Sequence, residues 1–117
     1  MLLRYDAREE RVMSGPRVFI TAYDPTKNLR GAAAFGAPTY LLKTIDVGDA
    51  LPLYIPELRE KLKDIRPTDF LLLVGDPLLI ATVAALAAYF CEGSVQFLKW
   101  DRMNREYFPV AMDLNAA

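Results

Sequence analysis

The sequence contains no histidine and only one cysteine, Cys91. Without histidine the chain lacks the usual general base at neutral pH, the usual triad member and the commonest metal ligand. One cysteine excludes an intramolecular disulfide and a zinc site built from several Cys and His ligands. These absences favour a non-catalytic protein over an enzyme, and the sequence indicates no particular cofactor. A single thiol is also compatible with a reducing compartment, so we expect a cytoplasmic protein.

The chain has no excess of charge of either sign, because 14 Lys and Arg stand against 15 Asp and Glu. A dedicated polyanion binder normally carries a positive excess that attracts nucleic acid at long range. Nucleic acid is therefore not favoured as a partner, although a local basic patch could still bind it. The first fifteen residues are too charged for a signal peptide, which argues against secretion.

One long hydrophobic run, residues 70–91, resembles a membrane span in length. Gly75, Asp76 and Pro77 interrupt it, and they would place a carboxylate and a helix breaker inside the lipid. The remaining helix of about fifteen residues would reach only about 22 Å, short of the roughly 30 Å apolar core. We therefore expect a buried strand and helix, and no membrane.

The residue pattern predicts one α/β domain over residues 1–117, with residues 1–15 as an N-terminal arm or short helix. Its sheet should be small and mainly parallel, flanked by helices, with a C-terminal antiparallel hairpin whose Pro109 marks an edge strand. We predict, in chain order, a strand at 17–23, a strand at 39–47, a helix at 57–65, a strand at 70–74, a helix at 78–90, and strands at 95–100 and 107–114.

The predicted helix at 78–90 is apolar on every side except at Thr82. Such a helix should be buried all round. Its alanines offer a smooth flank for close approach of a second helix, from this chain or from another copy. We therefore expect a homodimer.

Three of the predicted strands end in an aspartate, namely Asp24, Asp76 and Asp101. If their carboxylates met at one edge of the sheet, they would hold a divalent cation for phosphoryl-transfer or nuclease-type chemistry. Aspartate is also a preferred residue for helix caps and turns, which is the simpler interpretation.

The connection after the first strand carries the residues that would suit an anion. Ligands bind at the carboxyl ends of parallel strands, and here Gly-rich backbone and two cations follow such an end. The spacing of the two glycines matches a P-loop, but Ala37 and Pro38 stand where Lys and Ser or Thr are needed. The alternative is a flexible Gly/Ala connection with solvated charges. The predicted ligand-binding residues are Asp24, Lys27, Arg30, Gly31, Gly36 and Asp76.

The predicted hairpin tip gathers basic and aromatic side chains within a few positions. Aromatic rings beside arginines can stack on a base or a peptide, although in hairpins they often pair across the strands instead. The predicted partner-binding residues are Lys99, Trp100, Arg102 and Arg105.

These observations lead to two functional hypotheses. The first is a non-catalytic binding or accessory protein, dimeric, with a site for a small anionic ligand or a protein partner at the carboxyl edge of the sheet. The second is a metal-dependent enzyme that uses the three strand-end aspartates.

Overall fold

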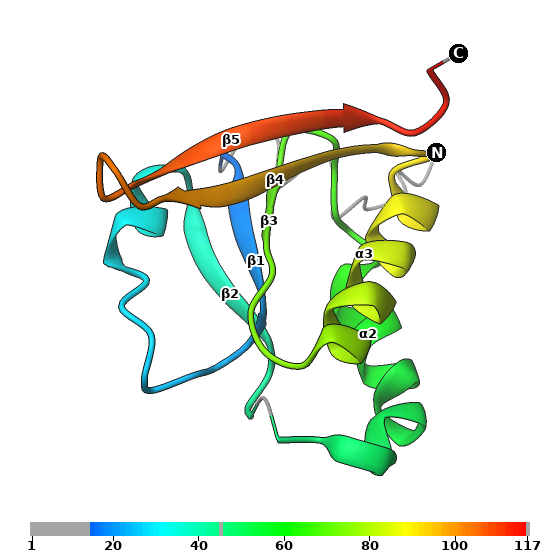
Figure 1. Ribbon diagram of the computed structural model, residues 1–117. Helices are drawn as coiled ribbons and strands as arrows, with labels where there is room; N and C mark the ends of the chain where they lie inside the picture. Colours follow the sequence, from blue (N-terminus) through cyan, green and yellow to red (C-terminus); the bar gives the residue numbers. More distant parts are fainter. Residues whose placement is uncertain (1–14, 45, 117) are drawn as a thin grey trace, which may run out of the picture.

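Five strands form one sheet in the order β2-β1-β3-β4-β5 (Figure 1). The first four in that order run parallel, and β5 runs antiparallel to β4. This computed structural model describes residues 15–44 and 46–116. It confirms the predicted fold class, a mainly parallel α/β sheet with a C-terminal antiparallel hairpin. The strands are β1 (Arg17–Ala22), β2 (Ala37–Leu42), β3 (Phe70–Leu72), β4 (Ser94–Asp101) and β5 (Glu106–Asp113).

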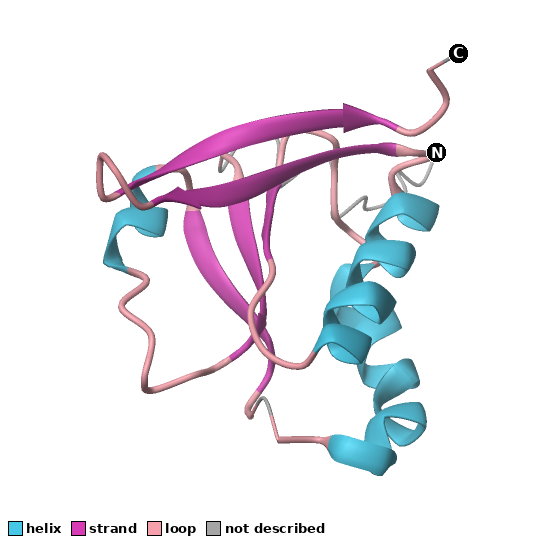
Figure 2. Ribbon diagram, viewed as in Figure 1, coloured by secondary structure: helices cyan, strands magenta, loops and turns pink. Residues whose placement is uncertain are grey.

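The two faces of the sheet are covered differently (Figure 2). Helices α2 (Ile55–Leu62) and α3 (Pro77–Phe90) pack on one face, where Leu58 and Val83 join a large apolar core. The short 3₁₀ helix η1 (Arg30–Ala34) packs on the other face through Ala32. A second 3₁₀ helix, η2 (Gly48–Tyr54), leads into α2. The β-branched and aromatic residues of β1 are buried because this strand has covering elements on both sides.

The connections after β1 and β3 leave the sheet toward opposite faces. From β1 the chain passes through η1 to β2, and from β3 it passes through α3 to β4. In an open α/β sheet, a crevice forms at the carboxyl ends of two neighbouring strands whose connections diverge in this way, and ligands bind there. The fold therefore places its topological switch point, the usual position of a ligand crevice in such sheets, between the ends of β1 and β3.

The β4–β5 hairpin extends beyond the rest of the sheet. β4 pairs with β3 only at Gln96 and Phe97, whereas it pairs with β5 over its full length. Its outer half is thus a two-stranded ribbon whose tip lies near η1 (Figure 1). Pro109 lies in β5, which has a partner strand on one side only, so the prediction of an edge strand is confirmed.

The second strand is shorter than the sequence pattern predicts. We expected a strand at residues 39–47, but β2 ends at Leu42. Its partner β1 ends at Ala22, so no backbone remains for residues 43–47 to pair with. Val47 is instead buried at the start of η2. The helix predicted at residues 57–65 is also displaced and is observed at Ile55–Leu62.

Within the described residues of the single chain, helix α3 is buried on one side only, and cover of its other side by a second copy stays a prediction. Leu79, Val83 and Ala87 face the core, whereas Leu78 is 62% exposed and Tyr89 is 69% exposed. Within residues 15–44 and 46–116, no further helix or strand covers the outer side of α3.

The arm or short helix predicted at residues 1–15 lies outside the described residues, apart from Gly15. Among the described helices, none combines the length and the apolar character needed to cross a membrane.

Candidate ligand-binding site

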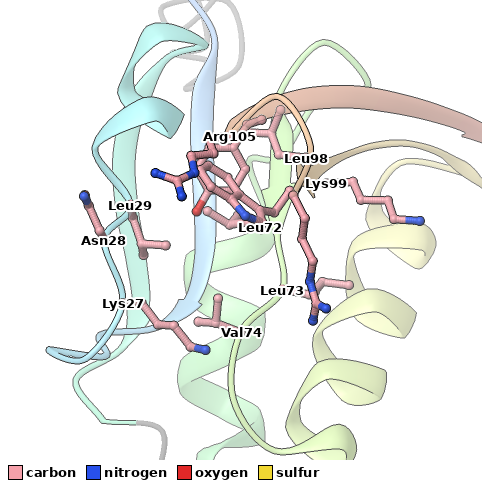
Figure 3. A pocket seen from close by; sticks show the side chains of 12 residues that line it. Lys27, Asn28, Leu29, Leu72, Leu73, Val74, Leu98, Lys99 and Arg105 are labelled. Carbon is pink, nitrogen blue, oxygen red and sulfur yellow. The ribbon is translucent and has the colours of Figure 1, made fainter.

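An open pocket of about 860 Å³ lies at the carboxyl ends of β3 and β4, on the side of the sheet that carries η1 (Figure 3). One wall is the connection after β1, and the opposite wall is the tip of the β4–β5 hairpin. Two segments that the sequence analysis singled out separately therefore meet at one site. The lining residues are Lys27, Asn28, Leu29, Leu72, Leu73, Val74, Leu98, Lys99, Trp100, Arg102, Arg105 and Tyr107.

Cations line the pocket, and among the described residues that border it there is no Asp or Glu. Lys27 comes from one wall, and Arg102 and Arg105 come from the other. In the part of the chain that the structure describes, none of these three forms an ion pair with an acidic side chain. Lys99 also borders the pocket, but its ammonium group points away from the centre (Figure 3). The side chain at position 99 points to the opposite face of β4 from its neighbours, as strand alternation requires.

Trp100 and Tyr107 form an aromatic pair across the hairpin. Their ring centroids lie 4.9 Å apart in an edge-to-face arrangement. Tyr107 also packs on η1, because a Cβ built at Gly31 would lie 3.3 Å from its ring. Burial raises the pKa of the Tyr107 hydroxyl above its usual value of 10.0. The pair thus holds the hairpin against η1, while Trp100 stays 45% exposed at the pocket.

The hairpin turn is held by Asp101. Its carboxylate accepts hydrogen bonds from the backbone N–H groups of Met103 and Asn104 and from the Asn104 side chain. These bonds lower the pKa of Asp101 below 3.8, with the Met103 bond contributing most. Arg105 then adopts a left-handed backbone conformation, φ 53°, that closes the turn. The acidic side chain at the tip is therefore engaged with its own turn, and the two arginines of the turn line the pocket.

Asp24 has an equivalent local role after β1. Its Oδ1 accepts hydrogen bonds from the hydroxyl and the backbone N–H of Thr26, at 2.6 Å and 2.9 Å. These bonds, first that of the Thr26 hydroxyl and then that of the backbone, lower the pKa of the Asp24 carboxyl below 3.8, and the charge of Lys27 adds to the effect. Asp24 thus organises the start of the connection that carries Lys27.

Several residues predicted to bind a ligand also make structural contacts or lie away from this pocket, and their binding role stays a prediction. A Cβ at Gly36 would lie 2.6 Å from the carbonyl oxygen of Pro16, so glycine is needed where β2 starts beside β1. Gly31 is needed for the contact with Tyr107. Arg30 does not line the pocket. Asp76 accepts hydrogen bonds from the N–H groups of Leu78 and Leu79, as the N-cap of α3.

The three strand-end aspartates do not form the metal site that we considered. Asp24, Asp76 and Asp101 each bind the backbone of their own turn or helix start. Within residues 15–44 and 46–116 there is no group of three Asp, Glu, Cys or His side chains that could hold a metal ion. The simpler interpretation of these residues, as caps and turn residues, is the correct one.

Sequence reasoning missed the apolar floor of the pocket, whereas the pairing of aromatic rings across the hairpin, which it offered as an alternative, is observed for Trp100 and Tyr107. Leu72, Val74 and Leu98 form this floor, and Leu98 shares a face of β4 with Trp100. The available signal was the alternation of side chains along a strand, which places positions 98 and 100 on one face of β4 and Lys99 on the other.

The match to a known family covers the whole sheet. The chain belongs to the phage Pam3 gp32-like protein family, whose sequence profile matches residues 16–114. Every residue that lines the pocket lies inside the part matched by the Pam3 gp32-like profile. A comparison with curated proteins and one with solved structures gave no match.

Proposed function

We propose that this protein is a non-catalytic binding protein that holds an anionic ligand in the pocket at the carboxyl edge of its sheet. One observation carries the proposal: Lys27, Arg102 and Arg105 line a pocket to which none of the described residues contributes an acidic side chain, in a chain whose net charge is −1. Because the chain as a whole is nearly neutral, this local excess of positive charge is not a consequence of composition.

The three cations are solvent-exposed, so their attraction for an anion comes from their gathering at one pocket and decreases with salt. The pocket also lies beside the topological switch point between β1 and β3, where open α/β sheets bind ligands. Fold and electrostatics thus favour the same place.

The polar groups of the pocket are suited to holding an anion and not to moving protons. Guanidinium groups stay protonated at neutral pH, so Arg102 and Arg105 cannot act as bases. The raised pKa of Tyr107 keeps its hydroxyl protonated as well. These properties support binding without catalysis.

Calorimetric titration with inorganic tripolyphosphate tests the proposal. The protein should bind it, and Lys27→Ala with Arg105→Ala should weaken binding at least tenfold, because charge-assisted bonds contribute about 1.5–3 kcal/mol each. Lys43→Ala is the matched control, since Lys43 is exposed and lies outside the pocket. Equal loss in the control, or no binding by the unmodified protein, would reject the pocket as an anion site.

We also propose that a second copy of the chain covers the outer face of α3. The exposed positions Leu78, Ala81, Ala85 and Tyr89 are spaced by three, four and four residues, so they lie along one face of the helix that a second helix could cover. No residue of this helix is charged, and the large residues of this face lie at its two ends with alanines between them. In two copies packed antiparallel, Leu78 of one helix would therefore lie beside Tyr89 of the other. This homodimer, working in the cytoplasm, completes the proposed function.

A further inference from the structure

We infer that the anion held by this pocket is a nucleotide unit, with its base stacked on Trp100 and its phosphate bound by the surrounding cations. The inference rests on the proposed function and adds the chemical class of the ligand. It starts from the mixed lining of the pocket, which offers an aromatic surface and apolar residues as well as positive charge.

Trp100 is placed as a stacking surface. It is 45% exposed although it is the largest side chain at the site, and its ring is fixed by the edge-to-face contact with Tyr107. Tyr107 in turn packs against the buried cluster that contains Ala32 of η1. A ring that is held in position before the ligand arrives loses little conformational entropy on binding. Every base has a π-face that can stack on such a ring.

The cations line both walls of the pocket, and the aromatic ring belongs to one of them. Lys27 approaches from the connection after β1, while Arg102 and Arg105 follow Trp100 in the hairpin on the opposite wall. A ligand whose base lies on Trp100 would thus have cations on either side for its phosphates. Arginine adds a planar donor group that binds phosphate through two hydrogen bonds.

The size and the floor of the pocket argue against a simple inorganic anion as the complete ligand. A volume of about 860 Å³ falls in the range of sites for organic ligands. The floor of Leu72, Val74 and Leu98 has no group to offer an anion but provides a surface for an apolar ring. The unit can come from a free nucleotide or from a single-stranded nucleic acid, which present the same base and phosphate.

Trp100 is the only tryptophan in the chain, so its fluorescence reports on this pocket alone. Titration with ATP, without divalent ions, should quench the fluorescence. Inorganic tripolyphosphate is the matched ligand, because it carries the same chain of phosphates without a base. Calorimetry should show tighter binding of ATP, by roughly 5- to 150-fold, the usual contribution of one base stacked on an aromatic side chain.

Trp100→Ala should remove the advantage of ATP and leave tripolyphosphate binding unchanged, whereas Trp100→Phe should keep most of the advantage. The melting temperature of each variant shows whether it is folded. If the alanine variant does not fold, the phenylalanine variant still tests the need for an aromatic ring at this position. A single-stranded oligothymidylate and a duplex of the same length separate the two sources. Tighter binding of the single strand than of ATP assigns the site to nucleic acid, and the reverse order assigns it to free nucleotides.

Two results overturn the inference, and they differ in what they leave standing. If tripolyphosphate binds as tightly as ATP and Trp100→Ala has no effect, the pocket binds anions but does not recognise a base. If neither ligand nor the oligothymidylate binds, the proposed anion site fails together with the nucleotide inference.

Discussion

The hydroxyl group of Thr21 bonds to both backbone polar groups of Val74. It donates to the Val74 carbonyl oxygen and accepts from the Val74 N–H at 2.8 Å. β1 and β3 are paired as far as Ile20 and Leu72, and the Thr21 side chain then takes the place of the next backbone bonds. This allows the two strands to separate at the switch point without leaving the Val74 groups unsatisfied.

Thr21→Val should therefore destabilise the protein by about 1–3 kcal/mol, because the isosteric side chain leaves the amide and carbonyl of Val74 without a partner. Urea unfolding measures the change. Thr82→Val is the matched control, since the Thr82 hydroxyl bonds only to the Leu78 carbonyl on an exposed part of α3. Equal stability of the two variants would show that the link between Thr21 and Val74 is not important for folding.

Gly36→Ala should destabilise the protein by about 1–3 kcal/mol, the usual cost of overpacking. The new methyl group would meet the Pro16 carbonyl oxygen at 2.6 Å, so the starts of β1 and β2 would have to separate. Gly31→Ala should cost less, because its 3.3 Å contact is with the Tyr107 side chain, which can move. Thermal unfolding compares the two, and Gly31→Ala should also shift the fluorescence of Trp100. The reverse order of stability would contradict these assignments.

The proposed homodimer predicts that the protein sediments as a dimer at tens of micromolar. Ala85→Glu should give a folded monomer, because Ala85 is exposed in the single chain but would be desolvated in the interface. Leu53→Glu is the control, since Leu53 is 81% exposed outside α3. A monomeric unmodified protein would remove the argument for a dimer.

The turn at Asp101 should lose stability only in acid. Its pKa is lowered in the folded state by the bonds from Met103 and Asn104, so the ionised form favours folding. This contribution is fully present above the unfolded value, near 3.8, and is lost as pH falls through the lower folded value. Carboxyl NMR titration should show a midpoint below 3.8, and Asp101→Asn assigns the signal by its loss. A midpoint above 3.8 would show that these bonds do not persist in solution.

The elements with a strong local pattern were predicted well from sequence. The strand predicted at 70–74 begins where predicted but ends at Leu72, two residues early. The Asp76–Pro77 start of α3 is observed where its residue types indicate, and β4 and β5 are within one residue of prediction. β2 was predicted too long, because its length depends on how far β1 can pair with it. Because the end of β1 decides where β2 stops, the residues of β2 themselves do not show where the strand ends.

For the candidate site too, local residue patterns were visible in the sequence, whereas contacts between distant segments were not. The sequence showed that Lys27 follows a strand and that Trp100 and Arg105 lie in a hairpin, but it gave these two regions separate hypotheses. Gly31 and Gly36 were assigned to a ligand because glycine at a turn and glycine at a close contact have the same appearance in a sequence. Only the contacts of each Cβ position distinguish them.

By itself, the sequence determined the class of the fold, the parallel strands, the edge position of Pro109 and the local charges, because these follow from periodicity, turn residues and side-chain chemistry within short segments. The tertiary structure alone decided that Lys27 and Arg105 line one pocket and that three aspartates do not meet. The strand order β2-β1-β3-β4-β5 and the extension of the hairpin beyond β3 bring those distant residues together. Both features result from pairing between segments far apart in the chain, where cooperative packing and not local preference selects the partner.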